Sequence, residues 1–159
     1  MRRLFLLIML LAAFSLFAQW EVGEVITQDY SWTDNNGEAH SIHELTAAGK
    51  VVYIFWGTSG WGGCAAAAPL LNTWWNNTAN HDEIYLICAY NWTNYSLPYG
   101  AQVNGYYGDF GNGYVPFFAV IGAYNVLMYA DNSYANSQAI IPAALDSFNS
   151  MGVVNPIST

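Results

Sequence analysis

The stretch Val51-Val52-Tyr53-Ile54-Phe55-Trp56 is the feature that most restricts the possible folds of this chain. Six apolar residues follow one another without a polar residue, and most of them are β-branched or aromatic types that favour strands. Such a run predicts a strand that is buried on both faces, in the middle of a sheet covered by helices. The run therefore favours an α/β fold.

The residues after this run predict a loop, a helix and a second buried strand. Residues 57–63 contain four glycines, and Cys64 to Ala68 then opens a segment of high helix propensity that continues towards Trp75. Pro69 falls inside this helix and should kink it. Residues 83–90 form the second apolar run. Together these segments predict a β-α-β unit.

The remaining elements extend this unit on both sides. Before it, residues 29–33 predict a strand, Asp34-Asn35-Asn36-Gly37 a hairpin turn, and Ser41 with Glu44 a capping box for a short helix that ends at Gly49. After it come a polar loop over 91–113 with a short helix at 100–106, strands over 117–121 and 126–130, and a closing helix over 137–148. The prediction is one α/β domain with a mixed sheet over residues 19–159.

Residues 1–18 are expected to be a secretory signal. Met1-Arg2-Arg3 is a short basic start, residues 4–17 are apolar apart from Ser15, and the small Ala18 precedes polar sequence. The apolar run is short for a membrane span, although a retained anchor stays open as an alternative. We therefore expect an exported protein, periplasmic or extracellular, without stable membrane association once the signal is cleaved.

Charge excludes one large class of partners. Without Arg2 and Arg3 the formal charge falls from −8 to about −10, and Lys50 is then the only Lys or Arg. Binding to a nucleic-acid backbone needs clustered basic residues, so we expect no nucleic-acid partner. Anionic membrane surfaces are disfavoured for the same reason.

Three segments resemble the thioredoxin superfamily, in particular its exported redoxin or thiol–disulfide oxidoreductase branch. They are the turn and short helix from Asp34 to Lys50, the strand end, loop and helix from Phe55 to Pro69, and the segment Tyr114-Val115-Pro116-Phe117-Phe118. The resemblance covers roughly residues 20–150. It implies a thioredoxin-like three-layer sandwich, with a mixed central sheet flanked by helices and an N-terminal β-hairpin extension. It also implies a cis proline at Pro116.

The active-site motif of the family is incomplete in this chain. The family uses Cys-x-x-Cys, with the second cysteine five residues before the helix proline, and Cys64 and Pro69 have this spacing. Cys64 therefore matches the resolving cysteine, and Trp61 stands where the attacking cysteine would be. Because the attacking thiolate opens the substrate disulfide and the second thiol resolves the mixed disulfide, one cysteine alone cannot complete the cycle.

The resemblance assigns Cys64 a catalytic position and places Trp56, Trp61, Val115 and Pro116 at a substrate-binding surface. In the family, the backbone of the residue before the cis proline, here Val115, pairs with an extended substrate segment. No cofactor and no metal are expected. His40 and His43 lack ligand partners in sequence and are interpreted as surface histidines.

Three hypotheses follow for function. In the first, Cys64 acts alone or with an external thiol on protein or peptide thiols and disulfides, or on a small-molecule thiol, and its pKa lies below that of an ordinary thiol. In the second, the protein is a redox-inactive peptide-binding module. The third, a one-cysteine peroxidase, is weaker because that chemistry uses an arginine near the thiol, and Arg2 and Arg3 leave with the signal.

The second cysteine, Cys88, lies in an apolar run and is interpreted as a small core residue. A disulfide between Cys64 and Cys88 remains the alternative.

Overall fold

The computed structural model describes residues 19–150, so the predicted signal at 1–18 and the last nine residues lie outside the described part. The described helices and strands are, in chain order, β1 Ser31–Thr33, β2 Ala39–Ser41, α2 Ile42–Ala47, β3 Val51–Trp56, α3 Gly62–Asn77, β4 Ile84–Cys88, the 3-10 helix η1 Ala101–Tyr106, α4 Tyr107–Phe110, β5 Phe117–Ile121, the 3-10 turn η2 Ala123–Asn125, β6 Leu127–Asp131 and α5 Tyr134–Asn149.

The central sheet has four strands in the order β4-β3-β5-β6. β3 pairs in parallel with β4 and antiparallel with β5, and β5 pairs antiparallel with β6, so the predicted mixed sheet is confirmed. All six residues of β3 are buried, as their apolar run predicts. This central position brings the end of β3 beside the start of β5, where Trp56 is opposite Phe117.

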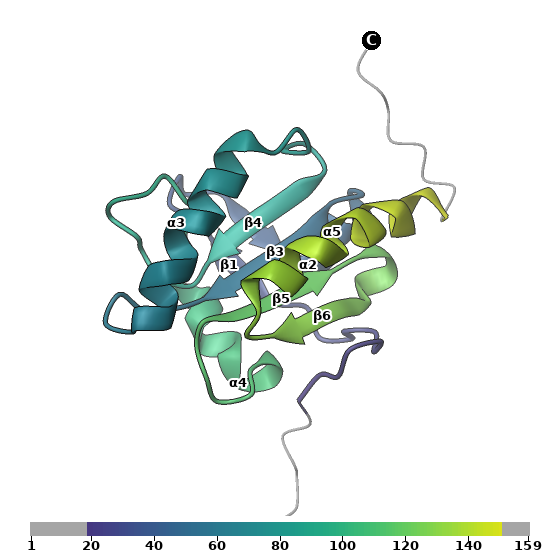
Figure 1. Cartoon of the computed structure of the whole chain (residues 1–159). Helices are drawn as coiled ribbons and strands as arrows, with labels where there is room; N and C mark the ends of the chain where they lie inside the picture. The colour runs from purple at the N-terminus through teal and green to yellow at the C-terminus, as the bar shows by residue number, and fades with distance from the viewer. Residues whose placement is uncertain (1–18, 151–159) are drawn as a thin grey trace, which may run out of the picture.

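Helices lie against both faces of this sheet (Figure 1), and a hydrophobic cluster fills the space on each face. Alternate residues of β3 enter one cluster with buried residues of α3 and α5, and the residues between them enter a second cluster with β1, α2, η1 and α4. The strand therefore divides its side chains between two cores, because successive residues point to opposite faces. The three-layer thioredoxin-like sandwich expected from the sequence is confirmed.

The N-terminal hairpin and its following helix also form as expected. β1 and β2 pair antiparallel and make a separate two-stranded sheet. Gly37 has a φ of +88° in the turn, a backbone conformation that glycine adopts without the steric cost of a Cβ. Ser41 and Glu44 make the predicted capping box of α2.

Two helix boundaries differ from the sequence prediction. α3 begins at Gly62 rather than Cys64, since Gly62 and Gly63 continue the helical backbone of the alanine run. α5 begins at Tyr134 rather than Ser137, because the side chain of Ser133 accepts a hydrogen bond from the Asn136 N–H and caps the helix earlier.

Within residues 19–150, none of the helices has both the length and the apolar character that a bilayer crossing requires.

Candidate functional site

Trp61 and Cys64 occupy the first turn of α3, at its N-terminus. Trp61 is the N-cap residue, and Gly62, Gly63 and Cys64 are the first three helical residues. The Trp61 side chain is 58% exposed, whereas Cys64 has no accessible surface. The residue that the sequence predicts at the attacking position is therefore exposed, and the cysteine predicted at the resolving position is buried.

The environment of Cys64 opposes thiolate formation. The residue belongs to the hydrophobic cluster between α3 and the sheet. Burial raises the pKa of the Cys64 thiol, and a hydrogen bond with the backbone of Thr58 opposes this shift only in part. The thiol-active hypothesis expects a lowered pKa, whereas in this structure desolvation raises the pKa of the Cys64 thiol more than the Thr58 hydrogen bond lowers it.

Cys88 lies at the end of β4 in the same hydrophobic cluster and is completely buried. Both cysteines are free thiols, so the structure contains no bond between Cys64 and Cys88. Burial strongly raises the pKa of the Cys88 thiol. The interpretation of Cys88 as a small core residue is confirmed.

The segment Tyr114-Val115-Pro116 faces the first turn of α3. The Val115–Pro116 peptide bond is cis. A Cβ placed on Gly63 would lie 3.0 Å from Pro116 Cδ and 3.5 Å from Trp61 Cδ1, so the proline ring packs directly against the helix start. The structure thus brings Trp61, Val115 and Pro116 into one surface, which we call the proline surface.

Asn132 fixes the backbone of this segment by hydrogen bonds. Its Nδ2 donates hydrogen bonds to the carbonyl oxygens of Tyr114, at 2.9 Å, and Pro116, at 2.6 Å. The hydroxyl of Tyr107 donates a second bond to the Tyr114 carbonyl at 2.7 Å. Within the described residues, the N–H and C=O of Val115 make no hydrogen bond. The two carbonyls on either side of Val115 are therefore fixed, while the backbone groups of Val115 itself stay available for an extended segment.

Trp56 has a different place from the other predicted binding residues. Its side chain is only 1% exposed, and its Nε1 donates a hydrogen bond of 2.8 Å to the Val103 carbonyl oxygen. The indole packs against Phe110 and Phe117. Trp56 thus supports the end of β3 from the core and presents no surface to a ligand in this conformation.

A hollow of about 270 Å³ opens between Ser59 and Ala65, near the start of α3, and the loop after β4. Ser59 and Tyr90 join across it through a hydroxyl–hydroxyl hydrogen bond of 2.8 Å. Its lining combines aromatic, hydroxyl and amide side chains with Ala65 of the helix, and includes Ser59, Tyr90, Asn91, Trp92, Thr93, Asn94 and Tyr95. The loop after β4 therefore adds a polar, aromatic recess next to Ser59 and Ala65, which sequence patterns did not indicate.

Solved structures show what this arrangement resembles. No protein-family model and no curated protein sequence matches the chain. Among solved structures, a DsbE-type thiol:disulfide interchange protein from Chlorobium tepidum has a TM-score of 0.61 at 16% identity, over 80% of this chain and 99% of that one. The chain has the thioredoxin fold.

Two further thioredoxin-fold structures extend the comparison. The exposed lipoprotein thioredoxin Etrx1 of Streptococcus pneumoniae has a TM-score of 0.56 at 15% identity, over 75% of this chain and 99% of that chain. StoA of Bacillus subtilis has the same TM-score of 0.56 at 11% identity, over 72% and 96% of the two chains. The proline surface of this chain thus belongs to a fold that is also found in thiol–disulfide interchange proteins.

The histidines differ from the sequence interpretation. The His40 side chain is only 14% exposed, and His43 is half-buried with its Nε2 at 2.9 Å from the Ile26 carbonyl oxygen. Both histidines are thus partly buried, and the interpretation as a surface histidine is wrong for His40, whose ring nitrogens have no accessible surface. His40 was misjudged because its burial depends on Trp32 and Tyr85, two rings that reach it from other strands.

Proposed function

We propose that the protein is an exported, redox-inactive member of the thioredoxin fold that binds an extended protein segment at its proline surface. The observation that carries this proposal is the difference in exposure between Trp61 and Cys64 in the first turn of α3. The attacking position presents the exposed indole of Trp61, and the thiol of Cys64 has no accessible surface. An exposed aromatic ring suits binding, because it buries a large area at low entropic cost.

The backbone supports the same proposal. The N–H and C=O of Val115 are the main-chain groups that an extended segment would pair with, as in addition of a strand to a sheet edge. Asn132 fixes the flanking carbonyls of Tyr114 and Pro116, so the segment would lose little backbone freedom on binding. Tyr114, which is 72% exposed, adds a second aromatic ring beside the segment.

A permanently unfolded test protein with carboxymethylated cysteines separates binding from disulfide exchange, because it has no thiol to exchange. We expect saturable binding, followed through the indole fluorescence of the chain and by calorimetry. Trp61→Ala should weaken binding by about tenfold or more, as expected for an aromatic anchor. Leu70→Ala is the matched control, since Leu70 is 53% exposed on the same helix but far along it from the first turn. Cys64→Ala should bind as well as the unchanged protein, and a collapse of its affinity would contradict the proposal.

The second candidate is thiol chemistry at Cys64, which the position of this residue in the first turn of α3 favours. Thiol counting distinguishes the two candidates. The binding proposal expects no reactive thiol in the native protein and two after denaturation, since both cysteines are free and buried. One rapidly reacting native thiol that is lost in Cys64→Ala would favour thiol chemistry instead.

A further inference from the structure

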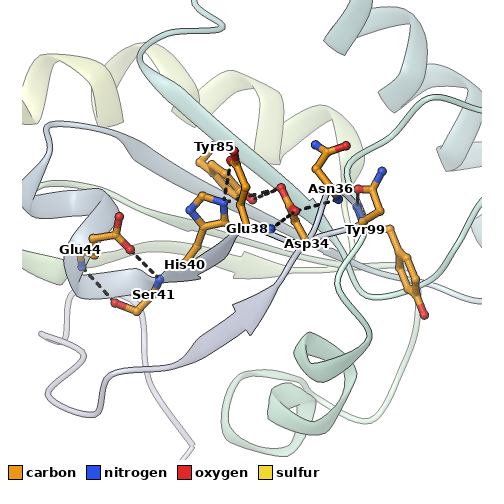
Figure 2. A network of polar contacts seen from close by, with 9 residues as sticks. Asp34, Asn36, Glu38, His40, Ser41, Glu44, Tyr85 and Tyr99 are labelled. Carbon is orange, nitrogen blue, oxygen red and sulfur yellow. Dashed lines mark hydrogen bonds and ion pairs between the residues drawn. The ribbon is translucent and has the colours of Figure 1, made fainter.

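Asp34, Glu38 and His40 gather on one face of the β1–β2 hairpin (Figure 2). His40 Nε2 lies 3.6 Å from Asp34 Oδ2 and 3.8 Å from Glu38 Oε2, and the three ligand-type atoms lie within 4.8 Å of one another. These separations are too long for direct hydrogen bonds. Two ligands that share a tetrahedral zinc ion lie about 3.3–3.5 Å apart, so a small shift of the side chains would fit a shared cation.

The hairpin register places the three side chains together. Trp32 is opposite His40 and Thr33 is opposite Ala39, which puts Asp34 opposite Glu38 at the next step. The Asp34 N–H donates to the Glu38 carbonyl oxygen at 2.9 Å and closes this pair. Because side chains alternate along each strand, the residues at 34, 38 and 40 share one face.

The Asp34 carboxylate is already oriented for a shared ligand. Its Oδ1 accepts hydrogen bonds from the N–H groups of Asn36, at 2.8 Å, and Glu38, at 3.0 Å. Its Oδ2 faces His40 and accepts a bond of 3.4 Å from the hydroxyl of Tyr85 on the edge strand β4. Such outer contacts are typical of residues that orient a metal ligand.

His40 supplies an independent observation. Both of its ring nitrogens lack accessible surface, and neither has a hydrogen-bond partner. The rings of Tyr85, at 4.6 Å, and Trp32, at 6.5 Å between ring centroids, pack beside the imidazole. A buried imidazole without a hydrogen bond is costly, and the only groups that face its Nε2 at ion-pair distance within the described residues are the carboxylates of Asp34 and Glu38. A cation between these groups would give the nitrogen lone pair a partner and balance the two negative charges.

We propose that Asp34, Glu38 and His40 form a binding site for a first-row divalent cation, with Zn²⁺ as the best match. One imidazole nitrogen and two carboxylate oxygens are ligands that Zn²⁺ accepts, whereas Mg²⁺ and Ca²⁺ prefer oxygen alone. The Glu38 side chain is 74% exposed, so the site opens to solvent on that side and its carboxylate is free to turn towards the ion. The bound ion would hold the turn of the hairpin against β4 through Asp34 and Tyr85.

The test is calorimetric titration of the untagged, chelator-treated protein with ZnCl₂, and with CaCl₂ and MgCl₂ for comparison. We expect one Zn²⁺ per chain, a rise in melting temperature with Zn²⁺, and at least tenfold weaker binding of the other two ions. His40→Gln and Glu38→Gln should each weaken Zn²⁺ binding by about tenfold or more. Glu38→Gln covers the case in which a change at the buried His40 prevents folding, since its exposed side chain has no role in the core.

His81→Gln is the matched control, because His81 lies in the loop before β4 against Trp75 and has no part in the cluster. It should bind Zn²⁺ like the unchanged protein. The proposal is overturned if Zn²⁺ leaves the melting temperature unchanged and binds only at millimolar concentration. It is also overturned if Glu38→Gln binds as well as the control, or if Ca²⁺ or Mg²⁺ binds as tightly as Zn²⁺.

Discussion

The tightness of the packing between the start of α3 and Pro116 can be tested by replacing two adjacent glycines, one at a time, with alanine. Gly62 and Gly63 are the first two residues of the helix, and both are exposed. A Cβ on Gly62 would meet no atom within 4 Å, whereas a Cβ on Gly63 would lie 3.0 Å from Pro116 Cδ. Replacing either glycine by alanine raises helix propensity by up to about 1 kcal/mol. Only the change at Gly63 also forces two atoms into a contact that is too close.

The difference between the two variants therefore isolates the contact with Pro116. Inserting a methyl group into a tight contact costs about 1–3 kcal/mol. Gly62→Ala should raise the free energy of unfolding by about 0.5–1 kcal/mol, and Gly63→Ala should fall below it by about 1–3 kcal/mol. For a domain of this size each kcal/mol corresponds to about 3–5 °C in melting temperature.

Urea denaturation and thermal melts of both variants provide the measurement, and binding of the carboxymethylated test protein provides a second readout. Gly63→Ala should also weaken binding, because it pushes Pro116 away from Trp61, whereas Gly62→Ala should not. Equal stabilisation by the two changes would refute the reasoning, since it would mean that the helix start and the proline ring are not in firm contact.

Three other changes test the site and its thiols. Trp61→Cys places a second thiol at the N-cap of α3, three residues before Cys64, and should create a pair that oxidises to a disulfide. Closing this four-residue loop should stabilise the folded, oxidised protein by about 2 kcal/mol. If residues 61 and 64 both stay free thiols after mild oxidation, the prediction is wrong. Asn132→Ala removes the side-chain donor of the Pro116 carbonyl and one of the two side-chain donors of the Tyr114 carbonyl. It should cost about 1–3 kcal/mol in unfolding free energy, against no loss for the exposed Asn136→Ala. The free energy of unfolding should be constant up to about pH 9 and fall above it. Burial raises the pKa of Cys64 above its ordinary 9.0, so above this pH the unfolded chain loses a proton that the folded chain keeps. Urea midpoints at neutral and alkaline pH measure the fall, and Cys64→Ala should reduce it.

Much of the fold could be predicted from the sequence because its strongest signals are local. The run from Val51 to Trp56 is apolar throughout, and only a strand buried on both faces accommodates it, so the centre of the sheet was correctly predicted. The capping box of Ser41 and Glu44 acts over three residues and forms as predicted. The early start of α5 was missed because Asn136, and not the Glu or Gln of a capping box, stands three positions after the cap residue Ser133.

The candidate site was predictable only where it depends on spacing along the chain. The distance from Cys64 to Pro69 marks the resolving position, and the same count places Trp61 at the helix start. The support of the cis-proline segment by Asn132 and Tyr107 depends on contacts from other parts of the chain, so no local pattern announced it. The burial of His40 was missed for the same physical reason, since its neighbours Trp32 and Tyr85 are brought to it by strand pairing and packing.

The proline surface does not depend on a cysteine at position 61. Pro116 is positioned by Gly63 through packing and by Asn132 through two hydrogen bonds, and none of these contacts involves a thiol. Cys64, in contrast, contributes to the hydrophobic cluster below the helix, where a small apolar side chain would serve equally well. The contacts that hold the proline surface are thus independent of those that bury Cys64. A chain can therefore keep the proline surface while the residue at position 64 serves only as part of the core. Retained binding in Cys64→Ala, together with lost binding in Trp61→Ala, is the pair of results that this separation requires.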